Sequence, residues 1–167
     1  MRLAALSTLF VCLASPSLAD LEVRFDEGAP KDRFTITNNG PCPLGMTAVT
    51  IDLSGSPYGL IFDTTGHGAG VEVYQPFEIA VGGENIMTLP QVLDGDNRLT
   101  LDLASLDVGA SVAFTIDIDD TVNAREITVS NTEIVGAKVI AKSDSGSAEG
   151  QFDETAIATV AISGCIS

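Results

Sequence analysis

Several residue types on which catalysis depends are scarce in this chain. It has no tryptophan, two tyrosines and a single histidine, His67. A serine, cysteine or threonine nucleophile needs a histidine or an equivalent base beside it, so such chemistry would depend on His67 alone. This histidine lies in the glycine-rich stretch TTGHGAG (64–70), which is typical of a flexible surface loop. We therefore expect a protein that is not an enzyme.

The scarcity of aromatic rings also bears on carbohydrate binding. Sugar-binding modules commonly stack tryptophan or tyrosine rings on sugar faces, and this chain offers only Tyr58 and Tyr74 for that role. Recognition of a glycan through hydrogen bonds remains open. So does glycosidase chemistry, which needs two carboxyl groups facing each other across a cleft, because acidic residues are abundant.

Basic residues are few. Eight lysines and arginines stand against 23 aspartates and glutamates, which gives a formal net charge of −15. Binding to nucleic acid requires clustered positive charge, so we exclude nucleic acid as a partner. The acidic surface favours cations or basic partners, and it equally suits a simple role in solubility.

Only one long apolar run is present, and it lies at the start. Arg2 precedes the run Leu3–Leu13, which is followed by the small-residue ending SLA. This pattern predicts a secretory signal peptide over residues 1–19, cleaved after Ala19. The run is about half of the roughly 20 residues needed to span a bilayer. We expect a single secreted domain over 20–167, extracellular or periplasmic, with no membrane span. Lipidation at Cys12 is the alternative, which the bulky Val11 before it disfavours.

After removal of the signal peptide two cysteines remain, Cys42 and Cys165. In an oxidising compartment such a pair predicts one disulfide bond. It would close a loop of over a hundred residues and tie the C-terminus to the early part of the fold. A zinc site is the competing interpretation, but with one histidine in the chain it would lack ligands.

Apolar residues alternate with polar ones along most of the chain, which is the pattern of strands with one buried face. Turn-forming stretches such as NNGP (38–41) and DGDN (94–97) separate the runs. We predict an all-β fold of roughly ten strands, an antiparallel β-sandwich of immunoglobulin-like or jelly-roll-like type. The expected strands cover 21–26, 33–38, 49–54, 71–74, 77–81, 85–89, 99–103, 111–118, 126–130, 134–142 and 155–163. Residues 143–150, SDSGSAEG, predict a mobile loop.

The stretch FTIDIDD (114–120) carries three aspartates in and after a predicted strand. Because Ile116 and Ile118 point to one face, Asp117 and Asp119 point to the other. Asp120 follows where the strand should end and could turn back toward them. Carboxylate oxygens are the ligands that calcium prefers, so Asp117, Asp119 and Asp120 form a candidate calcium site. The alternative is a solvated acidic face.

Four stretches together carry a resemblance to a known family. They are EGAPKDRFTITNNG (27–40), IDLSGSPYGLIFDTTG (51–66), GAGVEVYQPFE (70–78) and IDIDDTVNAREITVS (116–130). In this order they resemble the core domain of sponge aggregation factors, also called the wreath domain, and its exported bacterial relatives. The resemblance implies an extracellular protein that self-associates and supports calcium-dependent adhesion through attached glycans. It transfers no ligand residues to this chain.

Overall fold

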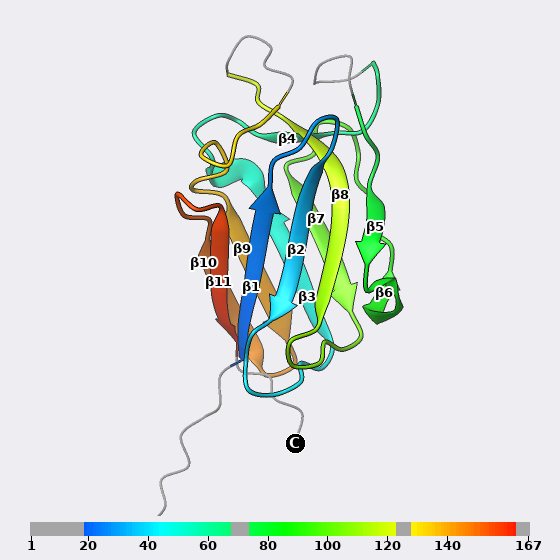
Figure 1. Cartoon of the computed structure of the whole chain (residues 1–167), viewed down its shortest axis with the longest axis vertical. Helices are drawn as coiled ribbons and strands as arrows, with labels where there is room; N and C mark the ends of the chain where they lie inside the picture. The colour runs from blue at the N-terminus through cyan, green and yellow to red at the C-terminus, as the bar shows by residue number, and fades with distance from the viewer. Residues whose placement is uncertain (1–18, 68–73, 123–127, 163–167) are drawn as a thin grey trace, which may run out of the picture.

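The computed structural model describes residues 19–67, 74–122 and 128–162, which form two packed antiparallel sheets (Figure 1). The first sheet has the order β11-β1-β2-β8-β4, with β5 also paired to β8. Its strands are β1 (Ala19–Asp26), β2 (Asp32–Asn38), β4 (Ile61–Asp63), β5 (Glu78–Val81), β8 (Ser111–Asp119) and β11 (Ile157–Ile162). β1 begins at Ala19, the residue after which we predict cleavage of the signal peptide.

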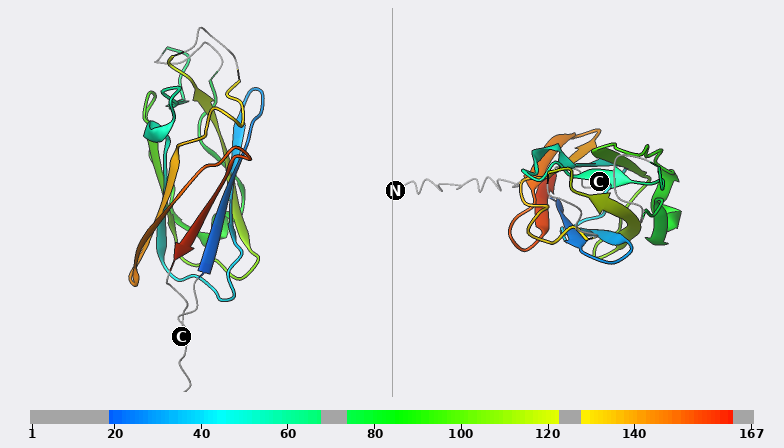
Figure 2. Two further views of the ribbon diagram at one scale, coloured as in Figure 1. Left: turned by 90° about the vertical axis from the view of Figure 1, so that its left-hand side faces the viewer. Right: turned by 90° about the horizontal axis from the view of Figure 1, so that it is seen from above.

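The second sheet has the order β10-β9-β3-β7-β6. Its strands are β3 (Thr47–Asp52), β6 (Ile86–Thr88), β7 (Arg98–Leu103), β9 (Lys138–Ser143) and β10 (Gly146–Gln151). Two short 3-10 turns, η1 (Leu53–Gly55) and η2 (Gly83–Asn85), follow β3 and precede β6. Seen from the side of β10 and β11, the two sheets are separate layers (Figure 2). The predicted antiparallel β-sandwich is therefore confirmed.

The core lies between the layers because the strands alternate. In β2 every second side chain, from Asp32 to Asn38, is buried. Phenylalanine rings join the strands at the centre: Phe34 lies 5.2 Å from both Phe25 and Phe114, and 6.2 Å from Phe152, between ring centroids. Aromatic contacts at such distances add to the burial of apolar area.

The two long sides of the sandwich differ. On one side, β10 and β11 approach so closely that a Cβ atom on Gly150 would lie 2.3 Å from the carbonyl oxygen of Thr159. Only glycine allows this contact, and it joins the sheets at that side. On the other side lie β5 and β6, short strands whose side chains are mostly exposed.

Three sequence expectations need correction. Residues 146–150 form most of β10 rather than a loop, because this edge strand pairs with β9 through its backbone and needs no apolar side chains. β9 starts at Lys138 rather than at 134, since residues 131–136 form turns. Strand β4 was not predicted, because three residues are too few to show alternation.

Two further predicted strands lie largely outside the described residues. Of 71–74 only Tyr74 is described, and it is not in a strand. Of 126–130 only 128–130 are described, and these are not in a strand either.

Candidate functional site

The predicted calcium ligands lie at the end of β8. Asp117 and Asp119 occupy the face opposite to the core residues Ile116 and Ile118, as the alternation predicts, but they are only 4% and 2% exposed. The alternative of a solvated strand face is therefore wrong. Asp120 follows the strand, and its Oδ1 accepts a hydrogen bond from the backbone N–H of Val122 (3.1 Å).

A third buried aspartate lies beside β8 where β2 begins. Asp32 is 1% exposed and pairs in register with Ile116. Its Oδ1 accepts from the N–H of Gly28 (3.0 Å) and its Oδ2 from the N–H of Ile118 (3.1 Å). The carboxyl group thus continues the hydrogen bonding of β8 past the point where β2 begins, which explains why an aspartate is accommodated there.

A fourth aspartate, Asp63, ends β4 directly opposite Asp117 in the antiparallel register. Opposite residues of an antiparallel pair project to the same face of the sheet. Asp63 is fully buried, and among the described residues neither of its carboxylate oxygens has a hydrogen-bond partner. We call Asp32, Asp63, Asp117 and Asp119 the buried carboxylate cluster.

The loop before β7 brings a further carboxyl group to Asp63. The Asp94 carboxyl group lies within side-chain hydrogen-bonding reach of a protonated Asp63 and raises its pKa, and the Oδ1 of Asp94 accepts from the N–H groups of Thr64 (3.0 Å) and Thr65 (3.2 Å). The predicted DGDN turn is thereby held against the residues that follow β4. The Thr65 N–H lowers the pKa of Asp63 but is outside hydrogen-bond geometry with it.

Burial and mutual repulsion favour protonated carboxyl groups in the cluster. Burial is the largest of the causes that together raise the pKa of Asp32 and of Asp63 to about 7, and the charge of Asp119 is among them for both. Burial also raises the pKa of Asp117 to about 8, together with the charges of Asp119, Asp32 and Asp63. Near neutral pH these groups are therefore still protonated in part, whereas ordinary aspartates are fully ionised.

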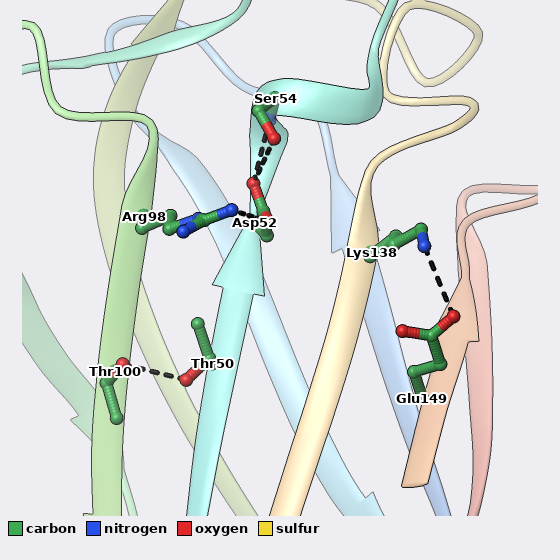
Figure 3. A network of polar contacts seen from close by, with 7 residues as sticks. All are labelled: Thr50, Asp52, Ser54, Arg98, Thr100, Lys138 and Glu149. Carbon is green, nitrogen blue, oxygen red and sulfur yellow. Dashed lines mark hydrogen bonds and ion pairs between the residues drawn. The ribbon is translucent and has the colours of Figure 1, made fainter.

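Another buried aspartate, on the outer face of the second sheet, shows the opposite behaviour (Figure 3). Asp52 is 5% exposed, forms an ion pair with Arg98 (2.8 Å) and accepts from the N–H (3.0 Å) and the hydroxyl (2.5 Å) of Ser54. Burial raises the pKa of Asp52, but these donors outweigh it and the pKa is lowered. Burial alone therefore does not set the cluster apart; Asp52 also has the positive charge of Arg98 beside it.

Sequence reasoning found Asp117 and Asp119 but missed Asp32 and Asp63. A signal was present for Asp63, because it directly follows the apolar residues Leu60 to Phe62 and so stands at the end of a buried segment. Asp32 lies next to Lys31 and Arg33, which makes it look like an ordinary surface residue. The pairing of both residues with β8 joins segments far apart in sequence, and spacing alone does not reveal it.

The cluster is not a preformed metal centre. Within the described ranges, no three histidine, cysteine, aspartate or glutamate side chains stand in the arrangement of a metal site. The carboxyl groups share one end of the first sheet without converging on a common point. A cation bound there would have to draw them together by side-chain rotation.

A second feature is apolar and lies on the side of β5 and β6. Val81, Met87, Leu89 and Leu93 are 47%, 50%, 64% and 70% exposed. They come from one continuous segment that leads from the end of β5 through β6, the last strand of its sheet. We call these four residues the apolar margin. Their concentration on one segment is unusual, because exposed apolar side chains on a monomer are normally scattered singly.

A shallow groove of about 250 Å³ lies on the second sheet. Its polar groups come from neighbouring strands, since Ala48 on β3 pairs in register with both Asp102 on β7 and Lys142 on β9. Met46 and Met87 supply its apolar lining. No tyrosine lines it, so any ligand would be held through hydrogen bonds and the two methionines.

The remaining predicted residues lie away from the cluster. His67 is exposed in the loop after β4, and residues 68–70 of that loop lie outside the described part of the chain. Cys42 packs against the core near the end of β2. Its predicted disulfide partner, Cys165, lies outside the described residues, so this pairing stays a prediction.

The fold defines the chain as an antiparallel β-sandwich. No family model matches it, and no curated protein does. Among the described residues no helix has the length and apolar character needed to cross a membrane.

Proposed function

We propose that this protein is a secreted, non-catalytic β-sandwich that acts outside the cytoplasm or at the cell surface by associating with further copies of itself. The observation that carries the proposal is the apolar margin on the open side of the sandwich. Sheets join edge to edge through features of this kind: four large apolar side chains on one exposed segment, next to the edge of β6 that has no partner strand among the described residues. The resemblance to aggregation factor cores agrees with this role.

We propose that calcium assists this association, because the chain is strongly acidic. A formal net charge of −15 opposes the approach of a second copy, and bound or screening cations reduce that repulsion. The first sheet also links the cluster to the margin: the N–H of Asp117 donates to the carbonyl of Gln75 (3.2 Å), and Gln75 lies in the segment that leads into β5. A cation at Asp117 would therefore be connected, through this hydrogen bond, to the segment that leads into β5, where the apolar margin begins.

Leu89→Lys tests the association surface. We expect the native chain to form dimers or larger species in calcium and the variant to remain monomeric, because a lysine at a 64% exposed apolar position places a charge in the contact. Sedimentation velocity with calcium and with a chelator measures the change. Val108→Lys, at a 52% exposed position in the loop before β8, is the matched control and should associate like the native chain. A native chain that is monomeric under both conditions would count against the proposal.

Glycan binding is the second candidate, favoured by the groove between Asp102 and Lys142. A carboxylate and an ammonium group on either side of a shallow sheet surface can hydrogen-bond sugar hydroxyl groups without aromatic stacking. Titration of acidic and neutral oligosaccharides against the native chain and an Asp102→Asn variant would test it. Saturable binding that the variant loses would favour this function over self-association.

A further inference from the structure

The buried carboxylate cluster raises a question of charge compensation. Asp63 has no exposed surface, and no described residue donates a hydrogen bond to either of its carboxylate oxygens. An ionised carboxylate in such a position is costly unless it takes up a proton or meets a positive charge. Its described acidic neighbours also raise its pKa, Asp94 mainly through a side-chain hydrogen bond to the protonated form and Asp119 through its charge, so the ionised form of Asp63 has no compensation from them.

Register places two more carboxyl groups on the same face. Asp63 lies opposite Asp117 across the β4–β8 pair, and Ile61, two residues earlier, lies opposite Asp119. Directly opposite residues have Cβ atoms about 4.5–5.5 Å apart, which is within the reach of two aspartate side chains toward one ion. Asp32 contributes charge from the other side of β8, while its own oxygens accept from Gly28 and Ile118.

We propose that Asp63, Asp117 and Asp119 bind a divalent cation, calcium, on the face of the β4–β8 pair. The ligands are all carboxylate oxygens, which suits a hard cation. Calcium accepts irregular coordination by six to eight oxygens at about 2.3–2.6 Å, whereas magnesium demands a near-octahedral site at about 2.0–2.1 Å. Three flexible carboxylates on two strands, drawn together by side-chain rotation, therefore favour calcium.

This site differs from the one that the sequence suggested. Asp63 replaces Asp120, whose Oδ1 already accepts from Val122 in a local turn beyond the end of β8. With Asp63 as a ligand in place of Asp120, the proposed site lies at the contact between β4 and β8 and not at the tip of β8. Cation binding at this place would fasten the three-residue strand β4 to β8 and is independent of whether copies of the chain associate.

The test is calcium titration of the full secreted chain, at concentrations where sedimentation shows one species. We expect one saturable site with a dissociation constant below about 1 mM, weaker binding of magnesium, and at least a tenfold loss of calcium affinity in Asp63→Asn. Asp107→Asn, which removes an exposed charge before β8, should bind like the native chain. Circular dichroism and thermal unfolding of each variant establish that the fold is kept.

Two outcomes would overturn the site. One is the absence of saturable calcium binding by the native chain. The other is an equal effect of Asp63→Asn and Asp107→Asn, which would indicate diffuse screening of an acidic surface instead of a site. Because binding is measured on a single species, a native chain that binds calcium but never associates would retain this site while refuting self-association.

Discussion

Without divalent cations, the protein is expected to unfold at a temperature about 5–15 °C higher near pH 5.5 than near pH 8.5. Asp32, Asp63 and Asp117 have pKa values raised by burial to about 7, 7 and 8, against an ordinary value of 3.8. Groups whose pKa is raised by folding stabilise the folded state fully below the unfolded value. That stability is lost progressively as the pH rises from about 4, where the unfolded chain ionises, to about 7–8, where the buried groups must ionise as well.

Calcium should restore the unfolding temperature at high pH. It binds the ionised aspartates of the folded protein and so stabilises the folded state by mass action. Asp63→Asn should also raise the unfolding temperature near pH 8.5, because it removes a buried carboxylate that has no donor. Asp52 serves as the contrast: its pKa is lowered, so its contribution is lost only as the pH falls below about 4. Thermal scans from about pH 3 to about pH 8.5 measure all three effects. A flat profile between pH 5.5 and 8.5 would contradict the interpretation.

Removal of the predicted disulfide should have the second large effect. Cys42→Ser is expected to lower the free energy of unfolding by about 2–5 kcal/mol, because a crosslink over so long a loop restricts the unfolded chain strongly. The geometry of the described residues suits such a link. β11 ends at Ile162, which pairs with Ala19 at the start of β1, and Leu21 of β1 pairs with Asn38 at the end of β2. β11 therefore ends at the same end of the sheet as the segment that carries Cys42.

Urea unfolding of Cys42→Ser against the native chain measures this effect. Cys165→Ser should give the same loss, and the double variant no more than either single change. Two free thiols in the folded, secreted protein, titrated under native conditions, would show that the bond does not form.

The general fold was predictable because alternation reports one buried face, and nine of the strands follow such alternating or turn-bounded runs. The exceptions have physical reasons. β10, with its glycines and serines, is held by backbone pairing with β9 at the edge of its sheet. β4 is too short for any period to appear, yet it supplies Asp63. The local sequence predicts neither the pairing of an edge strand nor a strand of three residues.

The candidate site was predictable in part. Asp117 and Asp119 were placed on the correct face of β8, because a strand's side chains alternate whatever surrounds it. Their burial was not predictable, since it depends on segments distant in sequence. Asp32 and Asp63 reach the cluster through pairing of β2 and β4 with β8, and single-sequence reasoning has no access to such register.

If calcium binds the buried carboxylate cluster, it must displace the protons that the cluster holds near neutral pH. Calorimetric titration of calcium near pH 7, in two buffers of different ionisation enthalpy, measures this exchange directly. We expect release of roughly one proton or more per calcium ion near pH 7, and nearly none near pH 9 where the carboxyl groups are already ionised. Calcium binding without proton release at either pH would contradict this expectation.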